Sequence, residues 1–228
     1  MNEKDKKTLE NTEEIFNWTY PGATLYYKDC DLDNSVLNKF QEGQILRNGY
    51  FLDVSWKGAG LDKNARFIIA SSKAAKLYEI NPDVEKFGHC CINANSYFKV
   101  MNVYQLKGKT QIFLLHIPAN GLDYFSKVIS NFDNQFIERA KKSFDEKIEM
   151  EPLPELLEKT WTDRTNFPVG MDAYNNFYPL DSITPIPEQG KQLYSGIRNL
   201  TKDNSDINKT SITKEEKPKS FWSRLFGK

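Results

Sequence analysis

One stretch of the chain, from Tyr97 to Met150, constrains the fold more than any other. It begins with two segments, 97–106 and 111–117, that are rich in β-branched and aromatic residues and are separated by Lys107-Gly108-Lys109. A short glycine-containing connection between two such segments is typical of a β-hairpin. The second segment is almost continuously apolar, which favours a strand that is covered on both faces.

A long amphipathic helix is predicted after this hairpin, from Leu122 to Met150. Asn120 can cap its N-terminus, and Asp123 places a carboxylate in its first turn. Pro152 and Pro154 prevent its continuation. Apolar residues recur at every third or fourth position, as in a helix that packs one face against a sheet, namely Leu122, Phe125, Val128, Ile129, Phe132, Phe136, Ile137, Ala140, Phe144 and Ile148.

The rest of the chain predicts one domain with flexible ends. Short apolar segments before residue 97 are expected to add strands to the sheet, including a hairpin of 49–56 with 65–70. We therefore expect an α+β fold, in which a mostly antiparallel sheet packs against one long amphipathic helix. Residues 1–12 are expected to be a disordered lead-in and 13–198 a single globular domain. The polar composition of 199–228 predicts a flexible linker ending in a basic and aromatic segment, which makes a disordered C-terminal tail.

Charge and cysteine content limit the cellular compartment and the partners that we expect for this protein. The 228 residues carry 31 basic and 31 acidic side chains, so no global field favours nucleic acid as a partner. Cys30, Cys90 and Cys91 are odd in number and two are adjacent, which is a poor framework for disulfides. Neither a signal peptide nor an apolar run long enough to span a bilayer is recognisable. We expect a cytoplasmic protein, peripheral at the inner face of the membrane if its tail binds lipid.

Candidate catalytic residues are few. The weak candidates are His116, in an apolar strand, and the neighbouring His89 and Cys90. The simplest interpretation of His116 is an inward histidine that hydrogen-bonds a neighbour, or one at a strand end that faces solvent. Neighbouring side chains of a strand point to opposite faces, so no metal site is predicted, and no cofactor either. No phosphate-binding loop or Gly-x-Ser-x-Gly elbow is present. The sequence leaves enzymatic activity uncertain and leans against it.

The C-terminal tail has the clearest functional implication. Phe221, Trp222, Leu225 and Phe226 would share one face of a short helix, and Arg224 is one of four cations in 217–228. Such segments dock on a partner protein or on an anionic membrane surface. We therefore expect a non-enzymatic interaction module of the adaptor or inhibitor type, with an unidentified protein or a membrane as its partner. A frayed tail that binds nothing stays open as well.

The alternative function is a small hydrolase-type enzyme or a small-ligand binder with a site near the aromatic loop 167–178. Phe167, Tyr174, Phe177 and Tyr178 are the candidates for lining a ligand groove. A hydrolase would combine this loop with His116 or His89 and would need a deep pocket and a perturbed titratable group. A binder would need the pocket alone.

Overall fold

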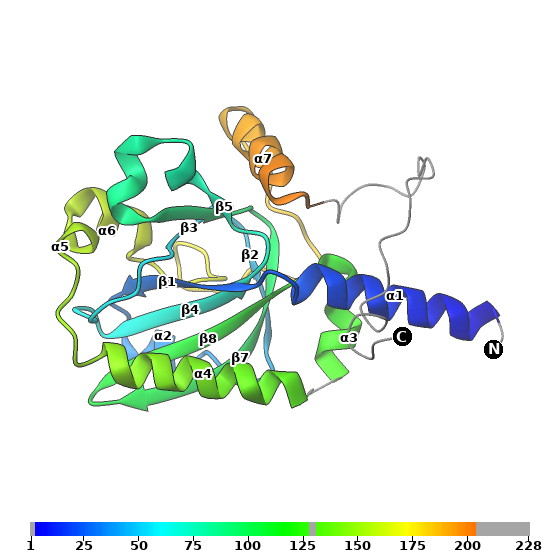
Figure 1. Cartoon of the computed structure of the whole chain (residues 1–228), viewed down its shortest axis with the longest axis horizontal. Helices are drawn as coiled ribbons and strands as arrows, with labels where there is room; N and C mark the ends of the chain where they lie inside the picture. Colours follow the sequence, from blue (N-terminus) through cyan, green and yellow to red (C-terminus); the bar gives the residue numbers. More distant parts are fainter. Residues whose placement is uncertain (1–2, 128–130, 204–228) are drawn as a thin grey trace, which may run out of the picture.

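The computed structural model describes residues 3–127 and 131–203 of the chain. At its centre is one eight-stranded sheet with the strand order β2-β7-β8-β4-β1-β3-β6-β5 (Figure 1). The strands are β1 (Thr24–Cys30), β2 (Ile45–Asn48), β3 (Leu52–Ser55), β4 (Ala65–Ser71), β5 (Ala75–Lys76), β6 (His89–Ile92), β7 (Ser96–Leu106) and β8 (Lys109–Ile117).

Helices surround this sheet. The α-helices are α1 (Glu3–Thr19), α2 (Asn34–Leu37), α3 (Leu122–Lys127), α4 (Asn131–Lys147), α5 (Pro154–Leu157), α6 (Lys159–Thr165) and α7 (Glu188–Thr201). Three short 3-10 helices are η1 (Leu77–Glu79), η2 (Pro82–Phe87) and η3 (Ala119–Gly121). In the part of the chain that is described, no helix combines the length and the apolar character that a membrane crossing requires.

The predicted hairpin after Tyr97 is confirmed. Strands β7 and β8 pair antiparallel, from Tyr97 opposite Ile117 to Leu106 opposite Lys109. The turn residues Lys107 and Gly108 have φ angles of 51° and 75°. Two consecutive positive φ angles match the twist of the flanking strands, so the turn holds the register of the hairpin.

The expected mostly antiparallel sheet is wrong, because the sheet is mixed. Strands β4 and β8 pair in parallel at its centre, from Ala65 opposite Thr110 to Ala70 opposite Leu115. The predicted hairpin of 49–56 with 65–70 does not form, since β1 lies between β3 and β4. All seven residues of β4 are buried. A strand that is apolar on both faces suits the centre of a sheet, but its composition does not reveal the direction of its neighbours.

The single long helix is also wrong. The predicted stripe is divided between two helices, α3 and α4, which run in different directions (Figure 1). Val128 and Ile129 lie outside the described residues, and Ile148 follows the end of α4. Phe125 of α3 and Ala140 of α4 belong to the same buried cluster, so each helix covers part of one sheet face. Spacing of three and four residues predicts which side chains turn inward, but it cannot detect a change of direction between two helices.

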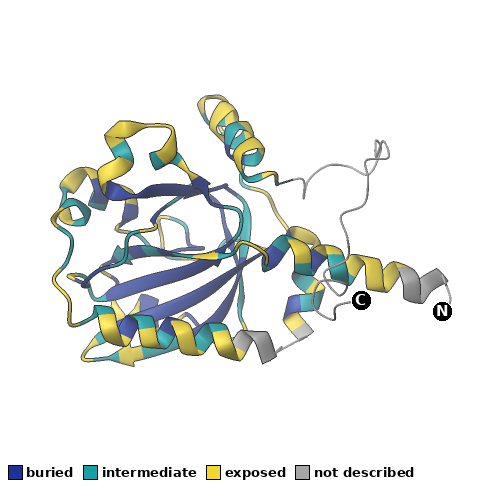
Figure 2. Cartoon of the chain, in the orientation of Figure 1, coloured by how far each residue is buried: buried dark blue, intermediate teal, exposed yellow. Residues whose placement is uncertain are grey.

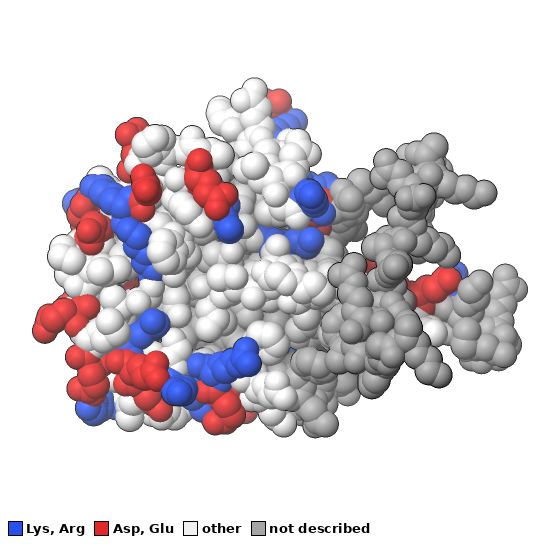
Figure 3. Space-filling model, viewed as in Figure 1, with Lys and Arg blue, Asp and Glu red and all other residues white. Residues whose placement is uncertain are grey.

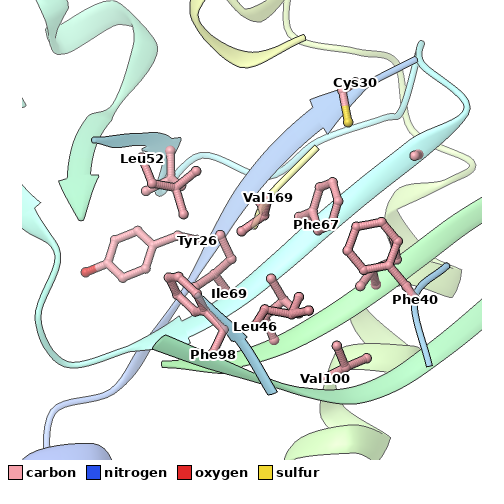
Figure 4. Close-up of a cluster of buried hydrophobic side chains, with 14 of the residues drawn as sticks. Tyr26, Cys30, Phe40, Leu46, Leu52, Phe67, Ile69, Phe98, Val100 and Val169 are labelled. Carbon is pink, nitrogen blue, oxygen red and sulfur yellow. The ribbon is translucent and has the colours of Figure 1, made fainter. Parts of the chain in front are cut away.

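The sheet has a hydrophobic core on each face. On one face lie alternate residues of the central strands, including Phe67, Ile69 and Phe98, together with Phe40 and Val169 from the connections (Figure 4). On the other face Ile68 and Phe113 pack against α1, α3 and α4. Burial therefore follows the strands, while the helices keep exposed outer faces (Figure 2).

The ends of the chain differ from the expected boundaries. Helix α1 begins at Glu3, inside the segment expected to be a disordered lead-in, and residues 7–10 on it are exposed. Helix α7 extends to Thr201, past the expected start of the linker. Residues 204–228 are not among the described residues.

Candidate functional site

A cavity of about 300 Å³ lies where β7 begins and β8 ends. Elements that are far apart in the sequence form its wall: the end of α1, the turn between β6 and β7, the segment after β8, and the chain around α7. Aromatic rings and polar side chains alternate around it. Its lining residues are Trp18, Asn93, Ala94, Asn95, Ser96, Tyr97, His116, Ile117, Pro118, Ala119, Ile183, Ile186, Tyr194 and Asp203.

Asn93 presents a buried polar atom without a partner. Its side chain is only 7% exposed, and its Nδ2 atom donates to the carbonyl oxygen of Tyr194 at 3.2 Å. Its Oδ1 atom has no hydrogen-bond partner among the described residues. Native proteins rarely leave a buried carbonyl oxygen unsatisfied, because the lost hydration costs about 1–3 kcal/mol. This oxygen is therefore an unsatisfied acceptor on a residue that lines the cavity.

His116 is a neutral, fixed ring in the same wall. Ser71 Oγ lies 2.7 Å from His116 Nδ1, and the backbone N–H of Lys73 donates to the same Oγ at 3.0 Å. The Ser71 hydroxyl can donate to Nδ1 in the tautomer that carries the ring proton on Nε2. Burial lowers the pKa of His116 to about 3. The prediction of an inward histidine hydrogen-bonded to a neighbour is confirmed.

The pairing of Ser71 with His116 does not form a hydrolase site. A nucleophile has to reach its substrate, and Ser71 is 0% exposed. The ring is instead held by aromatic neighbours, with Trp18 edge-on at 4.9 Å and Phe98 stacked at 5.0 Å between ring centroids. His116 is therefore a residue of the cavity wall.

His89 and Cys90 lie elsewhere in the sheet. His89 Nε2 is 2.7 Å from a carboxylate oxygen of Asp53, and the ring packs edge-on against Trp161. Cys90 is buried, and burial raises the pKa of its thiol to about 12, which disfavours the reactive thiolate. Across the described residues, no three His, Cys, Asp or Glu side chains converge as a metal site would require.

The four aromatic candidates of the loop 167–178 are not brought together. Phe167 packs on Tyr50 and lies over the Lys28 ammonium, whereas Phe177 packs on Phe40. Tyr174 is 84% exposed, and Tyr178 stands beside Tyr50. None of the four lines the cavity at the ends of β7 and β8. The ligand groove expected there stays a prediction, and its aromatic residues serve largely to cover the core.

Arg47 lies beside the cavity and is held by an irregular segment of the chain. We call residues 179–187, which lead into α7, the strap. The Arg47 side chain is buried and donates to Pro179 O at 2.7 Å, to Thr184 Oγ1 at 3.0 Å and to Asn95 Oδ1. Asn95 in turn accepts from the Thr184 N–H at 2.8 Å and donates to the Thr184 carbonyl at 3.0 Å. Asn95 therefore links the cavity wall, the guanidinium and the strap.

Sequence reasoning identified only His116 among the residues of this cavity. Asn93, Asn95 and Trp18 carry no motif, and they become neighbours only through the sheet topology. The one local signal in the sequence is the residue type of Asn95. Asparagine tolerates the left-handed region of backbone conformation, and Asn95 adopts it with a φ of 62°. That signal predicts a turn between β6 and β7, and it does not predict a binding site.

Acidic and basic side chains are intermixed on the face of the molecule shown in Figure 3, along α4 and around α5 and α6. The tail residues Phe221, Trp222, Arg224, Leu225 and Phe226, predicted to bind a partner or a membrane, lie outside the described residues.

Comparisons with known proteins give partial structural matches only. No family model matches the sequence, and no curated protein matches it. The ADP-ribosyltransferase HopU1 of Pseudomonas syringae pv. Tomato DC3000 is 16% identical over 42% of this chain and 45% of its own, with a TM-score of 0.37. The Vis toxin, an ADP-ribosyltransferase from Vibrio splendidus, is 15% identical over 46% of this chain and 52% of its own, with a TM-score of 0.35. The Clostridium limosum C3 exoenzyme is 12% identical over 51% of this chain and 70% of its own, with a TM-score of 0.34.

These matches correct the functional expectation. Two of the three proteins are ADP-ribosyltransferases and the third is an exoenzyme, so none of them is an adaptor or an inhibitor. The predicted non-enzymatic module that docks through its tail, with protein binding and membrane association as its activities, is therefore wrong. The chain spans about half the length of the first two proteins. Neither substrate nor mechanism transfers at this level of similarity, so the function is argued from the chain's own geometry.

Proposed function

We propose that the protein binds a small planar ligand that carries N–H donors, such as a carboxamide or the edge of a nucleobase, in the cavity at the ends of β7 and β8. The observation that carries this proposal is the Oδ1 atom of Asn93, a residue of the cavity lining, because this atom is buried without a partner among the described residues. A buried acceptor of this kind is satisfied by a donor on the ligand.

The size and lining of the cavity support a planar ligand. A volume of about 300 Å³ is at the lower end of the range of small-molecule sites. Trp18, Tyr97 and Tyr194 supply aromatic surface to its lining. Flat rings pack well against such side chains, in offset or edge-on arrangements.

The polar groups also restrict the charge of the bound group. His116 is neutral because burial lowers its pKa to about 3, so it adds no positive charge to the wall. Its Nε2 carries a proton in the tautomer that accepts from Ser71 at Nδ1. A carboxamide offers a donor to Asn93 and an acceptor of its own, as does the edge of a nucleobase.

Calorimetric titration of the full chain with nicotinamide, adenosine and NAD tests the proposal. These probes are chosen for their chemistry, since nicotinamide has a carboxamide, adenosine an aminopurine, and NAD both. We expect saturable binding and a rise in melting temperature with at least one of them. Release of nicotinamide from NAD, followed in the same samples, reports whether the bound ligand is also turned over.

Two matched variants locate the binding. Asn93→Leu removes the acceptor while it keeps the branching and the number of heavy atoms of the side chain, and it is expected to abolish binding. Asn102→Leu is the control, because Asn102 also has a buried Oδ1 without a partner among the described residues but does not line the cavity. If no probe binds at millimolar concentration, or if both variants weaken binding equally, the proposal is refuted.

A further inference from the structure

Arg66 shows how this fold normally accommodates a buried guanidinium. Its side chain is 1% exposed and pairs with both carboxylate oxygens of Asp29, each at 2.7 Å. Two further N–H groups donate to the carbonyl oxygens of Ala59 and Gly60. A buried cation is stabilised when an anion and additional acceptors surround it in this way.

Lys28 shows a second way to accommodate a buried cation. It is also buried, and its ammonium donates to the Thr165 carbonyl at 2.6 Å without a carboxylate bond. Burial lowers the pKa of Lys28 to about 8, so the side chain can lose its charge with little cost. Deprotonation is not open to an arginine, whose guanidinium stays charged in proteins.

Arg47 has neither a carboxylate partner nor a proton that it can lose. It is 1% exposed, and within the described part of the chain it contacts neutral groups only. Its N–H groups donate to Pro179 O, Ser182 Oγ, Thr184 Oγ1 and Asn95 Oδ1, and its guanidinium carbon lies 5.1 Å from the centre of the Tyr178 ring. No ion pair with a carboxylate joins it to any other described residue. Neutral acceptors bind a guanidinium less strongly than an oxyanion does. Among the described residues this buried positive charge is therefore surrounded by neutral groups.

We propose that Arg47 binds an oxyanion, a phosphate or a carboxylate, on the ligand of the cavity, and that the strap occupies this place in the ligand-free protein. The inference rests on the proposed function, because the anion would belong to the same ligand. Three strap oxygens now stand where the oxyanion oxygens would lie, and an anion that displaces them turns neutral hydrogen bonds into charge-assisted ones.

The position of Arg47 fits a ligand with two parts. Asn95 lines the cavity and accepts from Arg47, so the guanidinium lies one side chain away from the cavity. Ile183 and Ile186 of the strap line the same cavity. A planar group against Asn93 would therefore place a group attached to it near Arg47.

The strap is fitted closely at one point. A Cβ atom on Gly49 would lie 2.6 Å from Thr184 Oγ1 and 2.6 Å from the Tyr178 ring, so only glycine lets the strap approach Arg47. Elsewhere the strap is exposed, with Ile183 75% exposed. The strap is thus a closely fitted and largely exposed cover over the guanidinium.

Binding of adenosine and AMP to the full chain tests the inference. AMP adds one phosphate, and a charge-assisted contact with Arg47 is expected to make it bind about tenfold more tightly or better. Gly49→Ala pushes Thr184 and Tyr178 aside without changing Arg47, and is expected to strengthen AMP binding severalfold while adenosine binding stays unchanged. Gly196→Ala is the control, since its Cβ would meet nothing within 4 Å.

Titration with inorganic phosphate and with acetate separates this inference from the proposed function. If Gly49→Ala binds either anion more tightly than the natural chain does, and the double variant with Asn93→Leu does so as well, the anion site is supported. This holds even if adenosine fails to bind. Equal affinity of AMP and adenosine, with no response of either anion to Gly49→Ala, overturns the anion site even if adenosine does bind. Arg47→Met is expected to remove the advantage of AMP over adenosine, and Thr184→Val provides a second, milder release of the strap.

Discussion

Lys28 makes the stability of the protein depend on pH in a direction that can be worked out from its burial. The pKa of this ammonium falls from the ordinary value of 10.5 to about 8 in the folded chain, chiefly because burial removes its hydration. Between these two values the unfolded chain binds more protons than the folded chain, so stability rises as the pH rises. The whole effect amounts to about 3 kcal/mol, at 1.36 kcal/mol for each pKa unit.

The Lys28→Met variant isolates this contribution. It removes the titrating group together with its hydrogen bond to Thr165 and its contact with the Phe167 ring, and the dependence of these two contacts on the ammonium charge is already contained in the folded-state pKa. We compare the free energy of unfolding of the natural chain with that of the variant. The natural chain minus the variant should increase by about 2 kcal/mol as the pH rises from about 6.5 to about 9.5. Urea denaturation followed by tryptophan fluorescence measures both proteins at each pH.

Lys39→Met is the matched control. Lys39 also donates to a backbone carbonyl, that of Asn175 at 2.9 Å, but the side chain is exposed. Its difference from the natural chain should not change over the same pH range. A constant difference for Lys28→Met as well would refute the reasoning, because Lys28 would then titrate alike in the folded and unfolded chains.

Three further predictions concern the packing of the fold. Gly60→Ala should destabilise the protein severely, since its Cβ would lie 1.9 Å from the Met150 carbonyl oxygen, whereas Gly196→Ala should be neutral or slightly stabilising in thermal denaturation. Asp29→Asn should cost about 3 kcal/mol in urea denaturation because it leaves the buried Arg66 charge without its anion, and a loss below about 1 kcal/mol would contradict this role. The three buried cysteines should resist iodoacetamide in the native state and react together once urea unfolds the chain, as counted by mass spectrometry.

Sequence-based predictions succeeded where the residues involved lie close together in the sequence and failed where they lie far apart. The β7–β8 hairpin was predictable, because its turn and both strands lie within one short stretch and Gly108 favours the turn. The apolar side chains of α3 and α4 were also identified, but the change of direction between the two helices depends on the sheet they cover. The parallel pairing of β4 with β8 was missed, since it is decided by the insertion of β1 between β3 and β4.

The candidate site was less accessible to sequence reasoning than the fold. His116 was recognised as an inward histidine, yet its partner Ser71 lies 45 residues away in the chain. Asn93 becomes a candidate only in the folded chain. There the Tyr194 carbonyl accepts from its Nδ2, whereas its Oδ1 is buried without a partner among the described residues. Arg47 reads as an ordinary charged residue in a short strand, because neither its burial nor the absence of a carboxylate beside it can be read from its neighbours in sequence.

The central position of β4 has a consequence for how the chain is made in the cell. β4 is apolar on both faces, and its hydrogen-bonding edge toward β8 acquires its partner only after the ribosome has synthesised the segment from Ser72 to Ile117. Until then a nascent chain carries an open, hydrophobic strand edge of the kind that pairs with other chains. Binding of β4 by a chaperone at that stage would keep this edge from pairing with other chains.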